Sequence, residues 1–104
     1  MIKSQGMRTP KPGFGRLLEI YRHNNWMSQT ELAEALNRRG FAISVSAINR
    51  YESGLRNPPL DFVVSASACL KLSPEQESAL VMALFEDYSQ KFWRDYKEAL
   101  EKFK

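Results

Sequence analysis

The spacing of apolar side chains predicts a chain built from helices. From Phe14 onward, apolar residues recur every three or four positions, which is the period of a helix with one buried face. Short segments rich in Gly, Pro or Ser interrupt this pattern. Five helices are expected, over about residues 14–24, 28–39, 44–53, 60–72 and 73–104. We therefore predict an all-α fold in which the last helix is much the longest.

Residues that satisfy free backbone groups mark the ends of these helices. A serine is followed three residues later by Glu or Gln at 28–31 and again at 73–76, and this spacing is typical of a capping box at a helix N-terminus. Ser44 is expected to cap the third helix. Gly40 and Gly54 are expected to end the second and third helices, because glycine readily adopts the left-handed conformation that follows a helix.

The third helix is expected to have two different faces. Ala47, Ile48 and Tyr51 fall on one side and are suited to the core. The opposite side carries small or polar residues, namely Val45, Ser46, Asn49, Arg50 and Ser53. Bulky residues there would hold the backbone away from base edges, so a small polar face favours insertion of this helix into the major groove of DNA.

The last helix is too long for the rest of the domain to cover. Residues 75–104 contain no Gly or Pro and would span about 45 Å as a continuous helix. Its apolar positions continue to the end of the chain, so either the helix bends back on its own domain or a second copy covers the far half. The expected dimer or partner interface consists of Phe85, Tyr88, Phe92, Tyr96, Leu100 and Phe103.

The composition indicates a single domain, and the charged residues are unevenly distributed along the chain. The chain has 104 residues, of which 43% are hydrophobic and 26% charged, which is sufficient for one core. Residues 1–59 hold nine basic and four acidic side chains, a net charge of +5, whereas residues 60–104 hold six basic and eight acidic ones, a net charge of −2. The front part is therefore suited to a polyanion. We interpret residues 1–13 as a flexible basic arm that reaches along DNA or has no role.

The chain lacks the residue patterns of most enzymes and metal proteins. Cys69 and His23 are the only cysteine and histidine, so no internal disulfide and no zinc site made of spaced Cys or His pairs is expected. No apolar run approaches the roughly 20 residues that cross a bilayer. We therefore expect a soluble cytoplasmic, nucleoid-associated protein with no enzymatic activity, metal, cofactor or membrane contact. Trp26 and Cys69 are expected in the core, with redox sensing as an alternative for Cys69.

Three short blocks resemble one known family. They are Ser28-Gln29-Thr30-Glu31-Leu32-Ala33, Ser46-Ala47-Ile48-Asn49-Arg50-Tyr51-Glu52-Ser53-Gly54 and Arg56-Asn57-Pro58. From about Phe14 to Leu84 the sequence is similar to lambda-repressor-like helix-turn-helix regulators, also called the xenobiotic-response-element family. The resemblance implies a five-helix DNA-binding domain over 14–72, here followed by an extended C-terminal helix over 73–104. The segment 37–43 is longer than in the shortest members of that family.

The resemblance also implies roles for individual residues. The base-reading set would be Val45, Ser46, Asn49 and Arg50. Contacts to DNA phosphates would come from Gln29, Thr30, Ser44, Arg38, Arg39, Arg56 and Asn57. Arg22 and Glu52 would form a structural ion pair between the first helix and the end of the third. None of these residues is expected to be catalytic.

The function expected from these features is sequence-specific regulation of transcription. We expect a repressor that binds double-stranded DNA at a palindromic operator as a homodimer. Two alternatives remain at this point. The protein could be an antitoxin or accessory repressor that binds a second protein through its C-terminal helix, or a helix-turn-helix module that binds other proteins and no DNA.

Overall fold

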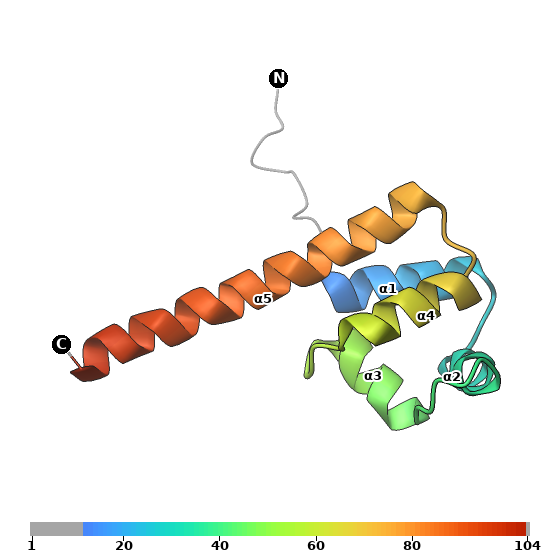
Figure 1. Ribbon diagram of the computed structural model, residues 1–104, viewed down its shortest axis with the longest axis horizontal. Helices are drawn as coiled ribbons and strands as arrows, with labels where there is room; N and C mark the ends of the chain where they lie inside the picture. Colours follow the sequence, from blue (N-terminus) through green and yellow to red (C-terminus); the bar gives the residue numbers. More distant parts are fainter. Residues whose placement is uncertain (1–11, 104) are drawn as a thin grey trace, which may run out of the picture.

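The computed structural model describes residues 12–103, and these residues form five α-helices (Figure 1). The helices are α1 (Phe14–Asn24), α2 (Gln29–Arg38), α3 (Val45–Ser53), α4 (Leu60–Cys69) and α5 (Pro74–Phe103). The predicted all-α fold of five helices is thereby confirmed. Most of the expected N-terminal arm, residues 1–11, lies outside the described residues.

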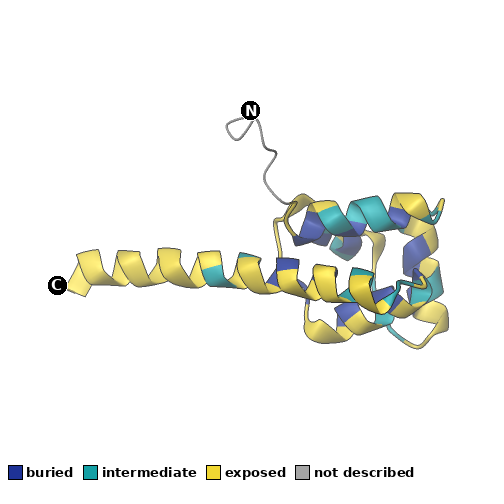
Figure 2. Cartoon of the chain, turned by 90° about the horizontal axis from the view of Figure 1, so that it is seen from above, coloured by how far each residue is buried: buried dark blue, intermediate teal, exposed yellow. Residues whose placement is uncertain are grey.

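Helices α1 to α4 and the first part of α5 enclose one apolar core. Helix α1 packs against α3 and α5, and α2 packs against α3 and α4. Figure 2 shows the buried positions gathered in this bundle and absent from the far half of α5. The core side chains are Phe14, Leu18, Leu32, Ala33, Leu36, Ile48, Tyr51, Phe62, Val63, Ala66, Leu70, Leu80, Ala83 and Leu84.

Side chains cap the N-termini of α2, α3 and α5. The hydroxyl of Ser28 accepts a hydrogen bond from the backbone N–H of Glu31 at 3.0 Å, and the Glu31 carboxylate accepts one from the N–H of Ser28 at 2.8 Å. Ser73 and Gln76 form the same reciprocal pair at 3.1 and 2.9 Å. Ser44 caps α3. Each cap satisfies a backbone donor that the helix itself leaves free.

Helix α1 receives its N-terminal cap from α5. Gly13 occupies the N-cap position of α1 and has no side chain to offer. Instead, the carboxylate of Asp87 accepts a hydrogen bond from the backbone N–H of Phe14 at 3.1 Å. A carboxylate at this end is also favoured by the helix dipole. This contact fastens the middle of α5 to the start of α1.

The C-termini of α1 to α4 end in one shared motif, with a residue at positive φ just beyond each helix. At Gly40 and Gly54 the φ angles are 91° and 81°, as expected for glycine. At Trp26 and Lys71 the φ angles are 58° and 54°, although these residues carry a Cβ. This position turns Trp26 outward, and it is 93% exposed. The prediction that Trp26 lies in the core is therefore wrong.

Helix α5 is a single rod whose C-terminal part extends away from the domain (Figure 1). It runs without a break from Pro74 to Phe103. Its last hydrogen bond to the domain runs from the hydroxyl of Tyr88 to the carbonyl of Pro58 at 2.7 Å. Every described residue from Gln90 onward is exposed (Figures 1 and 2). The possibility that this helix bends back on its own domain is therefore wrong.

The described residues offer no membrane span and no metal cluster. None of the helices within 12–103 is both long enough and apolar enough to cross a bilayer. The same part of the chain has no group of three or more His, Cys, Asp or Glu side chains placed to hold a metal ion. Cys69 is half-buried, and burial raises the pKa of its thiol against smaller opposing effects of Arg39 and Arg38. A protonated thiol is poorly suited to redox sensing.

Candidate nucleic-acid interface

Helix α3 presents its small polar side to solvent. Ile48 and Tyr51 are buried beneath it. The outward residues Val45, Ser46, Asn49, Arg50 and Ser53 are all exposed. In Figure 1 this helix lies at the lower edge of the domain, with α1, α4 and α5 above it. The four residues expected to read bases therefore share one accessible face.

Close packing against α1 holds α3 in place. A Cβ added to Gly15 of α1 would lie 2.4 Å from the carbonyl oxygen of Glu52 and 2.6 Å from that of Tyr51. Only glycine allows the two helix backbones to approach this closely. On the other side, the ring of Tyr51 packs on Phe62 of α4, with ring centroids 4.8 Å apart. The position of α3 is therefore fixed from both sides.

A buried ion pair joins α1 to the last turn of α3. Arg22 donates to both carboxylate oxygens of Glu52, with distances of 2.7 Å from Nε and 2.9 Å from Nη2. The two side chains are only 7% and 5% exposed. A further nitrogen of Arg22 donates to the carbonyl of Met27 at 2.8 Å, so the guanidinium also holds the turn between α1 and α2. The hydrogen bonds from Arg22 to Glu52 raise the pKa of the guanidinium, against the cost of its burial.

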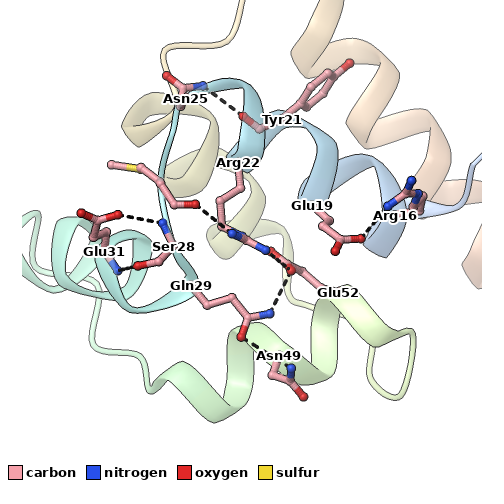
Figure 3. Close-up of polar contacts among 11 residues, drawn as sticks. Arg16, Glu19, Tyr21, Arg22, Asn25, Ser28, Gln29, Glu31, Asn49 and Glu52 are labelled. Carbon is pink, nitrogen blue, oxygen red and sulfur yellow. Dashed lines mark hydrogen bonds and ion pairs between the residues drawn. The ribbon is translucent and has the colours of Figure 1, made fainter.

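Gln29 connects this buried pair to the exposed face of α3. Its amide nitrogen donates to Glu52 Oε1 at 2.9 Å, and its amide oxygen accepts a long hydrogen bond from Asn49 Nδ2 at 3.5 Å. Figure 3 shows Gln29 lying between Glu52 and Asn49. The sequence pattern assigned Gln29 to phosphate contact alone. The structure adds an internal role, in which the ordered carboxylate fixes which end of the Gln29 amide faces Asn49.

Asn37 organises the turn between α2 and α3. Its side-chain nitrogen donates to the carbonyl of Ala33 at 2.7 Å and to that of Ile43 at 2.8 Å. Its side-chain oxygen accepts a weaker hydrogen bond from the N–H of Ile43 at 3.4 Å. These bonds hold the segment between α2 and α3 against the end of α2. Sequence reasoning missed this role, although Asn is one of the residues that commonly bond to nearby backbone.

The residues expected to contact phosphates fall into separate groups. Gln29 and Thr30 begin α2, and Ser44 caps α3, so these three lie where helix dipoles and free N–H groups favour an anion. Arg56 and Asn57 lie in the loop after α3. The remaining pair, Arg38 and Arg39, lies at the far end of α2, near enough to Cys69 to lower the pKa of its thiol. The structure does not bring this last pair together with Gln29.

One family of known proteins matches the chain. The sequence pattern of a helix-turn-helix family matches residues 20–76. The chain belongs to this family. The match covers more than half of the chain, including all of α2, α3 and α4. No curated protein and no solved structure matches the chain significantly.

Membership of the lambda-repressor-like helix-turn-helix family indicates a DNA-binding regulator. Domains of this family are typically not enzymes. The family match ends at residue 76, three residues into α5. The exposed distal half of α5, with its aromatic side chains, is therefore a feature of this chain beyond the shared domain.

Proposed function

We propose that this helix-turn-helix protein is a sequence-specific transcriptional repressor that binds a palindromic operator as a homodimer. The observation that carries this proposal is the small, polar and exposed face of α3, which the buried Arg22–Glu52 pair and Gly15 hold in a fixed position. A rigidly held face of this kind is what direct reading of base edges requires.

In this proposal, side chains of α3 read the bases in the major groove. The amide of Asn49 suits the N6 and N7 positions of adenine, and the guanidinium of Arg50 suits the O6 and N7 positions of guanine. Val45 and Ser46, nearer the start of the helix, contact neighbouring base edges, and Val45 offers methyl groups to thymine. These four residues determine which sequence is preferred.

The phosphate contacts then position the domain on the duplex without selecting a sequence. Gln29, Thr30 and Ser44 approach one backbone through the N-termini of α2 and α3. Arg56 and Asn57 approach it from the loop after α3, and Arg38 with Arg39 add positive charge at the end of α2. The net charge of +5 over residues 1–59 supports such an approach. Occupation of the operator would block transcription by occlusion.

A second candidate function is supported by the exposed aromatic side chains of α5. Phe92 is 66% and Phe103 is 85% exposed, and surfaces of this kind mark sites of protein association. An antitoxin or accessory repressor would use this surface to bind a different protein. Purification together with a second small protein in a fixed ratio would favour this candidate over the homodimer.

The base-reading role of α3 is tested by selecting binding sites from a random pool of double-stranded DNA. The wild-type chain is expected to enrich a palindromic sequence. Asn49→Ala and Arg50→Ala are each expected to relax the preference at one base pair of each half-site, at a cost of about 1–3 kcal/mol in binding.

Asn24→Ala is the matched control for Asn49→Ala, since Asn24 is also exposed but lies at the end of α1. This variant is expected to select the same sequence as the wild type. If the wild type enriches no sequence, or if Asn49→Ala leaves the selected sequence unchanged, the proposed reading by α3 is wrong.

A further inference from the structure

Gln29 is held between a buried carboxylate and the exposed face of α3. Its side-chain nitrogen donates to Glu52 Oε1 at 2.9 Å, and its side-chain oxygen accepts from Asn49 Nδ2 at 3.5 Å. These contacts join the start of α2 to the middle and the last turn of α3 (Figure 3). Gln29 therefore contacts one side chain that is proposed to read bases and one that is hidden from DNA.

The buried carboxylate decides how the Gln29 amide is turned. An ionised carboxylate only accepts hydrogen bonds, and that of Glu52 also accepts two from Arg22, at 2.7 and 2.9 Å. It therefore meets the NH2 end of the Gln29 amide, and the oxygen end points toward Asn49. The reverse arrangement would set a carbonyl oxygen against a carboxylate whose side chain is only 5% exposed, which is unfavourable away from water.

This orientation is passed on from Gln29 to Asn49. Because the oxygen of Gln29 can only accept, Asn49 turns its NH2 end toward α2. One hydrogen of that NH2 group and the side-chain oxygen of Asn49 then remain for DNA. The bond is long, at 3.5 Å, and it becomes stronger when bound DNA excludes water from the site.

The order of the two ends of the Asn49 amide matters for base reading. Adenine presents a donor at N6 and an acceptor at N7, whereas thymine presents an acceptor at O4. An amide with fixed ends accepts from adenine N6 and donates to adenine N7. An amide whose two ends exchange freely can also donate to thymine O4, so it no longer separates A·T from T·A.

We propose that Gln29 is a positioning residue for DNA sequence recognition, which fixes the Asn49 amide by means of its own hydrogen bond to Glu52. The inference rests on the proposed base reading by α3. It adds a residue outside α3 that determines the preferred base pair through another side chain. It also gives the buried pair of Arg22 and Glu52 a part in recognition, besides joining α1 to α3.

A contact to phosphate alone predicts a different result. Phosphate contacts fix the protein on the duplex and carry no sequence information, so their loss weakens binding to all sequences by the same factor. Loss of a positioning residue weakens binding to the preferred sequence more than binding to others. The backbone N–H groups at the start of α2, which favour an anion, are unchanged in either case.

The test compares two DNA duplexes, the operator selected by the wild-type chain and the same operator with the Asn49 base pair inverted in one half-site. The Asn49 base pair is the one whose preference Asn49→Ala relaxes. Fluorescence anisotropy at one salt concentration gives the ratio of the two dissociation constants, which is expected to be about 10- to 100-fold for the wild type. Gln29→Met has no N–H donor and only a weak acceptor, and it is expected to lower this ratio to about threefold.

Two further variants separate positioning from phosphate binding. Gln29→Lys adds a positive charge at the start of α2 but cannot accept from Asn49. It is expected to bind the inverted duplex at least as tightly as the wild type does, while the ratio still falls. Thr30→Ala, at the next and exposed position of α2, removes a proposed phosphate contact and is the matched control. It is expected to weaken binding to both duplexes equally and to leave the ratio unchanged.

The double variant Gln29→Met and Asn49→Ala shows whether Gln29 acts through Asn49. Its ratio is expected to equal that of Asn49→Ala alone, since no amide remains to be positioned. Gln29 is half-buried and Asn49 is exposed, so neither replacement removes a core side chain. Circular dichroism checks that each variant is folded, and Gln29→Lys gives the same readout if Gln29→Met is not.

Two results would overturn the inference while leaving the proposed function intact. An unchanged ratio in Gln29→Met would show that Gln29 contacts phosphate alone. A further fall of the ratio in the double variant would show that Gln29 acts on the bases without Asn49. A wild-type chain that selects no sequence refutes the proposed function instead, and the inference is then wrong as well.

Discussion

Trp26 occupies a backbone position at which glycine is usual. Its φ angle of 58° is similar in sign to those of Gly40 and Gly54 at the ends of α2 and α3, and a residue with a Cβ is strained there by about 1–2 kcal/mol. The exposed indole ring gains little burial to offset this strain. We expect Trp26→Gly to raise the free energy of unfolding by about 1 kcal/mol, allowing for the greater flexibility of glycine in the unfolded chain.

Urea denaturation followed by circular dichroism measures this change. Gly40→Ala is the matched reverse substitution, since an added Cβ at residue 40 would meet nothing within 4 Å and only the φ angle of 91° opposes it. It is expected to destabilise the protein by a similar amount. If Trp26→Gly instead lowers the free energy of unfolding, the indole ring must stabilise the folded state although it is exposed.

At the scale of single residues, the sequence predicted caps and core positions well but not the exceptions. The capping box of Ser28 and Glu31 depends on residues three positions apart, so the pattern alone could identify it. An aromatic residue at a helix end has no such pattern. It can be buried in the core, or it can take the positive φ angle that follows a helix and remain exposed, and only the folded structure shows which of the two occurs. Trp26 takes the second course, with a positive φ angle and an exposed ring.

At the scale of elements, the approach of α1 to α3 depends on Gly15. A glycine inside an exposed helix normally lowers stability, and its replacement by alanine raises it by about 1 kcal/mol. Here the added Cβ would lie 2.4 and 2.6 Å from two carbonyl oxygens of α3, and neither backbone can move without disturbing the core. We therefore expect Gly15→Ala to destabilise the protein by about 1–3 kcal/mol.

Thermal or urea denaturation measures the free energy of unfolding of Gly15→Ala. The prediction requires this free energy to be lower than that of the wild type. Arg16→Ala, at the next and exposed position of α1, is the control and is expected to change stability by less than about 0.5 kcal/mol. Increased stability of Gly15→Ala would mean that α1 and α3 can separate at little cost, and that α3 is held less firmly than we argue.

The elements themselves were largely predictable, whereas their side-chain connections were not. The small polar face of α3 followed from period and residue type alone. The link from Glu52 through Gln29 to Asn49 joins residues 20 or more positions apart, and no local pattern specifies which rotamers meet. The same holds for the cap that Asp87 provides to α1 across 73 positions.

At the scale of the whole molecule, the sequence allowed the last helix to bend back on its own domain, and the structure shows one continuous helix instead. The apolar rhythm from Leu80 to Phe103 was consistent with a single buried stripe. Separate inner and outer faces became visible only when Leu80 and Leu84 were found against the domain and Phe85 facing solvent. A period close to 3.6 cannot by itself tell one wide apolar face from two narrow ones.

The contacts of α5 also determine where the chain can be shortened without harming the domain. A truncation at Phe85 would remove Asp87, which caps α1, and Tyr88, which binds the carbonyl of Pro58. A chain ending at Gln90 keeps both contacts and loses the exposed apolar side chains Phe92, Tyr96, Leu100 and Phe103. We expect this shortened chain to fold as a monomer and the full chain to be a dimer.

The salt dependence of DNA binding then reports the number of protomers on the operator. The proposed base and phosphate contacts include four arginines of each protomer, namely Arg38, Arg39, Arg50 and Arg56. If each neutralises one phosphate, the logarithm of the binding constant of the dimer falls with the logarithm of salt concentration at a slope of about −7. The chain ending at Gln90 is expected to bind one half-site with a slope of about −4, because only one set of arginines takes part.

Fluorescence anisotropy over a range of salt concentrations measures both slopes on the same labelled operator. Equal slopes for the two chains would mean that α5 does not bring two protomers to the DNA, even if it associates in free solution. A slope near zero for the full chain would contradict the phosphate contacts altogether. A difference of about twofold between the slopes requires both the DNA interface on α2 and α3 and the association through α5. This one comparison therefore tests DNA binding and dimer formation together.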